Sequence, residues 1–241
     1  MAVAKRESGK IPFRVVFEEK LHRDVAMSSE ASKRYKALPW TKALGHTVVI
    51  STFFVAYFYV MAHPVFPVRQ MPVLAPDRWI PLLPWTVWIY FSLWFYICLP
   101  SVLIASRRTL WHLFLGALLM AVLGFTVFIL YPTQVPEWGV DWDAYPSFFS
   151  FLKSPDLSGN ACPSMHVSYS VFGGLWLWAL QRHLNVRRRW QWAGGLWGLA
   201  IVLSTISTRQ HVFIDLVFGV LLGITVFYLN LGWMRRLKVP W

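Results

Sequence analysis

The fold is decided by one long apolar stretch, WQWAGGLWGLAIVLSTISTRQHVFIDLVFGVLLGITVFYLNLGW, which runs from Trp190 to Trp233. As a single α-helix these 44 residues would be about 66 Å long. The hydrocarbon core of a bilayer is only about 30 Å thick, so the stretch must fold back on itself. Its one polar interruption runs from Ser204 to His211. We therefore expect two membrane helices joined by a turn at that point.

The rest of the chain has the same character, because long apolar blocks alternate with short polar gaps. Hydrophobic residues occupy 56% of the 241 positions, and the mean hydropathy is +0.47. Six blocks are long enough to cross a membrane, at roughly Leu44–Ala62, Trp79–Ala105, Leu110–Tyr131, Met165–Leu180, Trp190–Ile206 and Val212–Trp233. The predicted fold is all-α, a polytopic membrane protein with six transmembrane helices.

The chain divides into three predicted parts. Residues 1–43 form a basic amphipathic segment in which charges are mixed with apolar residues such as Phe13 and Phe17. We expect this arm to lie on the cytoplasmic membrane surface. The six-helix membrane domain follows over residues 44–234, and residues 235–241 form a basic tail. The first 40 residues contain no apolar core, so no cleavable signal peptide is expected.

The basic residues predict how the helices are oriented. The chain has a net charge of +12, and 19 of its 23 lysines and arginines lie in the arm, in the tail or in alternate gaps between blocks. The other gaps hold only Arg69, Arg78, Lys153 and Arg209. By the positive-inside rule both termini are cytoplasmic, in a bacterial inner membrane or in an endomembrane of a eukaryote. The same distribution indicates anionic lipid headgroups rather than nucleic acid as the partner of the positive charge.

Cysteine usage argues against a disulfide and against a metal centre. Cys98 lies within an apolar block and Cys162 beside a polar loop, so the predicted topology separates them in depth. Neither their number nor their spacing matches a zinc site, and no oxygen-rich cluster suited to magnesium is present. We expect no metal and no cofactor.

Two histidines on the predicted outer face are candidates for chemistry. His166 follows Pro163 and Ser164 at the start of the fourth block. Proline suits the first turn of a helix, and the free N–H groups of a helix start attract anions. His211 opens the sixth block, with Asp215 four residues later on the same face.

The pair of His211 and Asp215 has two interpretations. A carboxylate inside a membrane segment is costly unless paired, and pairing with one ring nitrogen leaves the other free as a nucleophile. The alternative is a structural pair that ties the helix end to a neighbour. Because the charge rule places His166 on the same face as His211, we favour a functional site.

These residues resemble the signatures of a known family. Ala161-Cys162-Pro163-Ser164-Met165-His166 resembles the second signature (P-S-G-H type) of the type-2 phosphatidate phosphatase, or lipid phosphate phosphatase, superfamily. Ser204 and Thr205, followed by His211 and Asp215, resemble the third signature, S-R-x5-H-x3-D, with both spacings matched. The resemblance covers about the last three predicted spans.

Two departures from the family pattern are informative. The first signature, K-x6-R-P, is absent between the third block and Pro163, and Thr205 occupies the position of the usual arginine. This combination is similar to the branch that contains the inositol phosphorylceramide synthases, which transfer a phosphorylated headgroup between lipids. Phosphate release and headgroup transfer are therefore both open, as is a third class, a non-catalytic lipid-binding scaffold.

The resemblance implies roles for the site residues. His211 would be the nucleophile that forms a phosphohistidine, Asp215 would orient its ring, and His166 would be the general acid and base. The expected substrate is a lipid phosphate or phospholipid. The residues that we expect to bind its phosphate are Ser164, Ser204, Thr205 and Arg209, and with weaker support Lys153 and Asn160. The loop Pro132–Pro163 is expected to cover the site.

Overall fold

The computed structural model describes residues 29–145 and 159–240. Of these described residues 72% are helical and 3% are in strands, which confirms the predicted mostly helical class. Most of the N-terminal arm lies outside the described residues, and so does Lys153.

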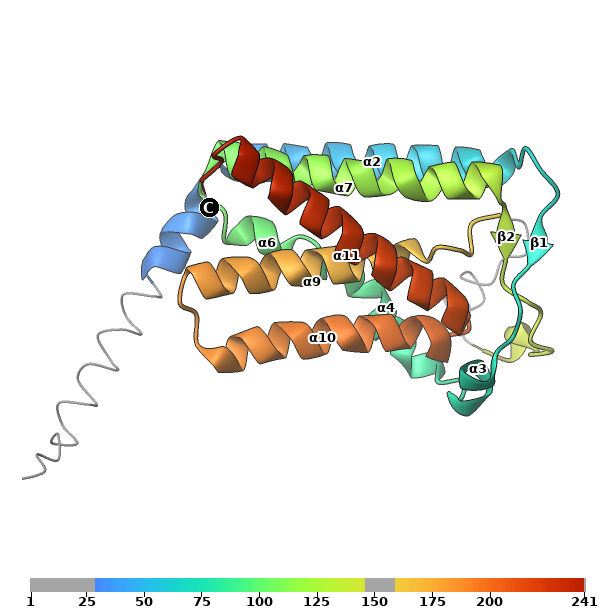
Figure 1. Cartoon of the computed structure of the whole chain (residues 1–241). Coiled ribbons are helices and arrows are strands. Elements are labelled where there is room, and N and C mark those ends of the chain that lie inside the picture. Colours follow the sequence, from blue (N-terminus) through green and yellow to red (C-terminus); the bar gives the residue numbers. More distant parts are fainter. Residues whose placement is uncertain (1–28, 146–158, 241) are drawn as a thin grey trace, which may run out of the picture.

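Long helices form the body of the protein (Figure 1). They are α2 (Pro39–Ala62), α7 (Arg107–Leu130), α9 (Met165–His183), α10 (Arg188–Ser207) and α11 (Phe213–Arg236). Shorter segments are α3 (Ala75–Trp79), η1 (Pro84–Thr86), α4 (Val87–Phe91), α5 (Leu93–Tyr96), α6 (Leu99–Val102), η2 (Trp142–Ala144) and the strands β1 (Arg69–Gln70) and β2 (Thr133–Gln134). The chain reverses between the end of α10 and the start of α11, which confirms the predicted turn.

Four helical stretches of the described residues are long and apolar enough to cross a membrane. They are Pro39–Ala62, Pro84–Val102, Arg107–Leu130 and Phe213–Arg236. α9 and α10 have 19 and 20 residues and pack side by side, but they are not among the four. Both are interrupted by glycine and serine, and α10 begins with Arg188 and Arg189. A membrane protein is thus supported, whereas the total of six spans stays a prediction.

The second predicted helix differs from the expectation. A span is present at Pro84–Val102, within the predicted Trp79–Ala105, but it is assembled from η1 and the short helices α4, α5 and α6 rather than from one continuous helix. Pro84 begins the 3₁₀ turn and Pro100 lies in the first turn of α6. Each proline lacks the N–H needed inside a helix, so the segment can only restart at these positions.

α9 is the central helix of the bundle, and its packing against α11 depends on two glycines. A Cβ atom at Gly219 would lie 2.7 Å from the carbonyl oxygen of Ser164, and one at Gly223 would lie 2.7 Å from that of Ser168. Both distances are too short for any real side chain. The Gly-x-x-x-Gly spacing therefore lets the backbones of the two helices touch, as it does in membrane helix pairs.

A two-stranded parallel ladder, which the sequence did not predict, closes one end of the bundle. Arg69 pairs with Thr133 and Gln70 with Gln134. Asn160 adds an isolated bridge to Thr133. The segments after α2, after α7 and before α9 are therefore held together at this end (Figure 1).

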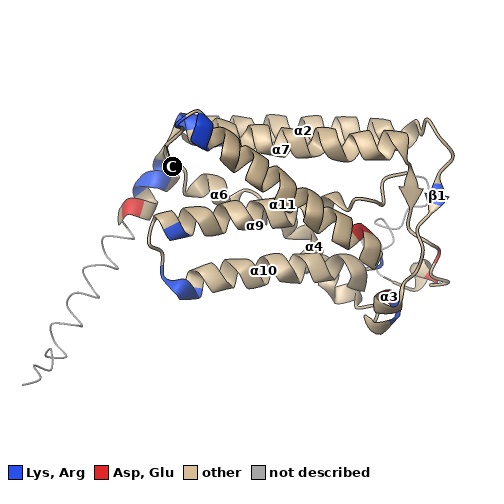
Figure 2. Cartoon of the chain, in the orientation of Figure 1, with Lys and Arg blue, Asp and Glu red and all other residues tan. Residues whose placement is uncertain are grey.

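Charges are separated along the bundle. Clusters of lysines and arginines lie at the end where α7 and α10 begin and α11 ends, whereas the opposite end has only scattered basic residues, at β1 and α3 among others (Figure 2). Asp215 is in the first turn of α11, at that opposite end. The fold thus places the arginine-rich and lysine-rich segments between the apolar blocks on one side, as the predicted orientation requires. The cytoplasmic assignment of that side stays a prediction.

Candidate active site

Three helix ends meet at the end of the bundle away from the basic residues: the start of α9, the end of α10 and the start of α11 (Figure 1). His166 is the second residue of α9, and His211 lies in the turn before α11. The centroids of their rings are 6.1 Å apart. The fold therefore brings together the two histidines that the sequence singles out.

Ser164 joins the start of α9 to the start of α11. Its hydroxyl oxygen accepts a hydrogen bond from the N–H of Val167 at 3.3 Å, as an N-cap residue does. Its own N–H donates to the carbonyl oxygen of Asp215 at 3.1 Å. Ser164 is completely buried, so its observed role is to hold the His166 helix against the Asp215 helix. Its predicted phosphate contact stays a prediction.

His211 and Asp215 are adjacent and buried. The distance from His211 Nδ1 to Asp215 Oδ2 is 3.5 Å, which is an ion-pair contact longer than a hydrogen bond. The same Oδ2 accepts a hydrogen bond from the N–H of Val212 at 3.0 Å, and the N–H of His211 donates to the carbonyl oxygen of Thr205 at 3.1 Å. These bonds fix the carboxylate on the Nδ1 side of the ring and leave Nε2 on the other side.

Tyr90 is a site residue that the sequence did not reveal. Its hydroxyl lies 3.1 Å from His166 Nδ1, and the two rings stack with their centroids 4.2 Å apart. Trp94 contacts the same imidazole edge-on at 6.1 Å. Tyr90 therefore orients the ring of His166 and occupies its Nδ1, so that Nε2 is the nitrogen left for proton transfer. No motif marks Tyr90, because it lies 76 residues from His166.

The variant Tyr90→Phe tests this positioning role. Without the hydroxyl the His166 imidazole keeps its stacking on the Tyr90 ring but loses the hydrogen bond at Nδ1. We therefore expect kcat to fall about 10-fold, less than the roughly 100-fold or more that loss of the general acid–base group itself would cost. KM should stay within about twofold, because the loss is felt in the transition state only. The matched control is Tyr59→Phe, which removes an exposed hydroxyl on α2. An unchanged kcat in Tyr90→Phe would contradict the role.

The hydroxyls of Ser204 and Thr205 point back into their own helix. That of Ser204 donates to the carbonyl of Ile201 at 2.6 Å, and that of Thr205 donates to Val202 at 2.7 Å. Both residues are buried. Their observed function is to end α10, where the carbonyl of Thr205 receives the N–H of His211. Contact of these hydroxyls with phosphate stays a prediction.

Arg209 lies in the turn between α10 and α11 and holds the backbone of the segment that contains Asp77 and Ile80. Its guanidinium donates to the carbonyl oxygens of Asp77 and Ile80, at 2.7 and 3.0 Å, and stacks over the ring of Trp138 at 4.3 Å. Burial lowers the pKa of Arg209, and the charge of Asp77 opposes that shift. With a φ of 58° Arg209 is in the left-handed region, which costs a residue other than glycine roughly 1–2 kcal/mol.

Asp77 is a second site residue that the sequence did not reveal. It is completely buried, and its Oδ1 accepts the N–H of Phe213 at 2.6 Å while its Oδ2 accepts the N–H of Leu74 at 2.8 Å. It thus caps the first turn of α11, immediately after His211. The available signal was a lone acid in the otherwise apolar segment after β1, but its partner Phe213 lies 136 residues away.

The remaining candidates lie to the side of the histidine pair. The side-chain amide of Asn160 donates to the hydroxyl of Tyr57 and to the sulfur of Met61, so it is directed at α2. Burial, with a contribution from Asp215, raises the pKa of the Cys162 thiol to about 12. That thiol is therefore protonated at neutral pH and is no nucleophile. Cys98 and Cys162 are both free, as predicted.

Comparisons with known proteins agree with the two signatures. Residues 108–238 match the family model of the PAP2 superfamily. Comparison with curated proteins and with solved structures gave no match. The matched region runs from the start of α7 to the end of α11, so it includes every helix end that forms the histidine site as well as α7. The chain therefore belongs to the PAP2 superfamily, the family of phosphatases and phosphotransferases that the signatures around His166 and His211 predicted.

Proposed function

We propose that this protein is an integral membrane phosphatase or phosphotransferase that acts on the phosphate ester or diphosphate of a lipid, on the periplasmic or lumenal face. Superfamily membership supports phosphatase-type chemistry in general, and four apolar helices support a lipid environment. The observation that carries the proposal is the distance of 6.1 Å between the rings of His166 and His211.

This distance suits one phosphoryl group held between the two rings. An attacking nitrogen lies about 3–3.5 Å from phosphorus before reaction. A proton donor lies about 2.6–3.2 Å from the leaving oxygen. Two rings whose centroids are 6.1 Å apart can therefore place one nitrogen on either side of a single phosphoryl group.

In the first half-reaction His211 attacks phosphorus through Nε2. A P–N bond forms as the P–O bond to the leaving group breaks, and His166 donates its Nε2 proton to the departing oxygen. The positive charge on the His211 ring is compensated by Asp215, which lies 3.5 Å from Nδ1. The product is a phosphohistidine, as expected for an activated nitrogen nucleophile.

In the second half-reaction His166 accepts a proton from water or from an acceptor hydroxyl. The oxygen of that group attacks phosphorus, the P–N bond breaks, and its electron pair returns to His211. Water yields free phosphate, whereas a lipid alcohol yields a new phospholipid. Tyr90 keeps the same nitrogen of His166 directed at both oxygens.

Headgroup transfer is the second candidate function, and Thr205 favours it. The family signature with arginine at this position belongs to the hydrolases, and threonine is similar to the synthase branch. Membranes incubated with a labelled lipid phosphate, with and without a candidate lipid alcohol, separate the two. A new labelled lipid indicates transfer, and labelled phosphate alone indicates hydrolysis.

Arg209 is our candidate for the positive charge that the absent first signature would supply. We expect Arg209→Ala to lower kcat/KM about 100-fold, the effect of removing one preorganised donor from a developing anion. Because Arg209 also holds the carbonyls of Asp77 and Ile80, the melting temperature should fall as well. Arg209→Lys keeps the charge but not the forked geometry.

Comparison of Arg209→Ala with Arg209→Lys separates the contribution of the positive charge to phosphate binding from the structural contribution of the bonds to Asp77 and Ile80. Partial recovery of kcat/KM in Arg209→Lys, at the melting temperature of Arg209→Ala, would support the role in phosphate binding. If both variants lose activity equally, and in step with the fall in melting temperature, Arg209 has a structural role alone. The control is Arg69→Ala, which removes a guanidinium that stacks 4.4 Å over Tyr131 at the same end of the bundle.

A further inference from the structure

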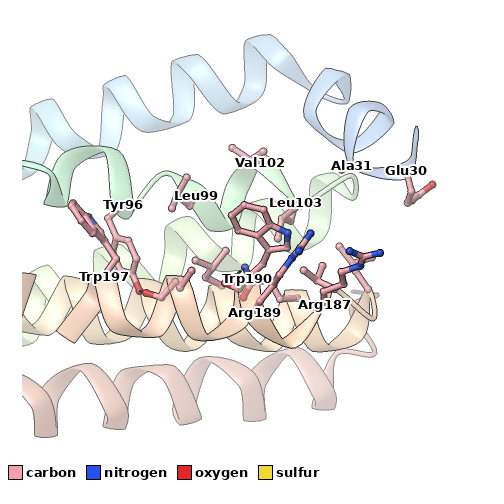
Figure 3. Close-up of a pocket in the computed structure, with 16 residues that line it drawn as sticks. Glu30, Ala31, Tyr96, Leu99, Val102, Leu103, Arg187, Arg189, Trp190 and Trp197 are labelled. Carbon is pink, nitrogen blue, oxygen red and sulfur yellow. Dashed lines mark hydrogen bonds between the residues drawn. The ribbon is translucent and has the colours of Figure 1, made fainter. Parts of the chain in front are cut away.

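A large cavity lies far from the histidine site, at the basic end of the bundle. Its volume is about 1020 Å³, and it is bounded by α5 and α6 on one side and by the ends of α9 and α10 on the other. Figure 3 shows Tyr96 and Trp197 at one end of it and Arg187 with Arg189 at the other. Neither His166 nor His211 lines it. The proposed reaction therefore makes no use of this space.

The inner part of the cavity is apolar and its wall is held rigidly. Leu99 and Trp197 are 42% and 48% exposed, large fractions for such residues. The indole N–H of Trp197 donates to the hydroxyl of Ser92 at 3.0 Å, and the hydroxyl of Tyr96 donates to the carbonyl of Gly194 at 3.0 Å. These two bonds satisfy the polar atoms of Tyr96 and Trp197, whereas the buried Oε1 of Gln181, also on the wall, has no hydrogen-bond partner among the described residues. The leucines, Val102 and the rings of the wall offer hydrocarbon surface to an occupant.

The mouth of the cavity is positively charged. Arg187 and Arg189 line it, and Arg189 lies 5.5 Å from the ring of Trp190. The one carboxylate among the described lining residues is Glu30, which already receives a hydrogen bond from Arg34 at 2.8 Å. The guanidinium of Arg34 also donates to the carbonyl of Leu103 on the cavity wall. Among the described residues that line the mouth, arginines therefore outnumber carboxylates, which favours an anion.

We propose that this cavity binds one anionic phospholipid, with its phosphate against Arg187 and Arg189 and an acyl chain along α10 toward Trp197. From Arg187 to Trp197 the helix rises about 15 Å, which gives an acyl chain a continuous apolar wall. Tryptophan at the mouth matches the preference of this residue for the membrane interface. The chemistry required is that of an amphiphile with a negative headgroup, and the bilayer around the helices supplies it.

The site is separate from the proposed catalytic site. α9 has 19 residues, so the ends that carry His166 and the cavity mouth are about 28 Å apart. A lipid at the mouth therefore contacts α9 and α10 at their far ends. It acts on the bundle as a stabilising ligand of the folded state rather than as a substrate.

The test is titration of the full-length protein in detergent with phosphatidylglycerol, and with phosphatidylcholine of the same acyl chains, followed by native mass spectrometry. We expect tighter binding of phosphatidylglycerol. Because each arginine near a membrane surface contributes about 1 kcal/mol toward an anionic headgroup, Arg187→Ala with Arg189→Ala should weaken this binding about 30-fold. Removal of Arg235 and Arg236, at the same end but outside the cavity, should change it less than threefold.

A second variant tests the apolar part independently of charge. Ala193 lines the cavity and is exposed, so Ala193→Trp fills the space without disturbing the core. We expect it to weaken phosphatidylglycerol binding about 10-fold, with no change in the melting temperature of the lipid-free protein. The matched control is Ala193→Ser, which adds a single atom.

Three outcomes would overturn the proposal. The first is equal binding of both phospholipids. The second is full competition by millimolar inorganic phosphate, which would assign the arginines to a free anion. The third is loss of the bound lipid in His211→Ala together with its retention in the Arg187 and Arg189 double variant, which would place the lipid in the catalytic site.

Discussion

His211→Ala is expected to lower the turnover of lipid phosphates by about 10⁴-fold or more, because it removes the group that forms the covalent intermediate. The side chain is 9% exposed and lies beside Asp215, whose carboxylate accepts a hydrogen bond from the N–H of Val212. Its truncation therefore leaves the backbone of the turn in place. We expect the variant to fold and to melt within a few degrees of the wild type.

Two measurements make this result interpretable. The control is His63→Ala, which removes an exposed histidine bonded only to its own helix at Tyr59. It should retain full activity. Brief incubation with labelled substrate, followed by alkaline quenching, should leave label on the wild type and none on His211→Ala. Turnover within 10-fold of the wild type in His211→Ala would refute the covalent mechanism, and absence of label on the wild type would favour the scaffold.

Gly219→Ala is expected to have the second largest effect, although it touches no reacting group. The added methyl would lie 2.7 Å from the carbonyl oxygen of Ser164 and 2.8 Å from Cβ of Val167, so α9 must move away from α11. Overpacking of this kind costs about 1–3 kcal/mol of stability. Because Ser164 and Val167 flank His166, the same movement separates the two histidines, and a shift near 1 Å lowers activity about 100-fold.

The control for this prediction lies on the same helix. A Cβ at Gly232 meets nothing within 4 Å, so Gly232→Ala makes the same chemical change without a clash. It should leave activity unchanged and should not lower the melting temperature, since alanine favours helix over glycine. If both variants behave alike in thermal melts and in turnover, the close approach of α9 and α11 does not determine the geometry of the site.

Short-range spacing rules explain why much of this protein could be predicted from its sequence. The bilayer thickness divides the stretch Trp190–Trp233 into two helices, and α10 and α11 end and begin on either side of the predicted turn. The spacing from His211 to Asp215 is one helical turn, and the structure has the two side chains in contact. Such features depend on residues close together in the chain, so a local rule suffices.

The same rules fail where prolines or distant partners intervene. The span expected over Trp79–Ala105 begins only at Pro84 and consists of short helices rather than one, because hydropathy alone does not register where prolines such as Pro84 and Pro100 restart a helix. Tyr90 and Asp77 were missed for another reason. Each contacts a site residue more than 70 positions away, and neither belongs to a signature.

By itself the sequence determined a helical membrane protein of this superfamily, and it singled out two histidines and an aspartate as candidate site residues. Both results rest on the lengths of apolar blocks and on short spacings, which are local quantities. Only the tertiary structure decided that the rings of His166 and His211 approach to 6.1 Å, which depends on Gly219 allowing two helix backbones to touch. It also decided that Tyr90 and Asp77 hold the site in place. Contacts between distant segments are set by the packing of whole helices, and no pattern within one segment encodes them.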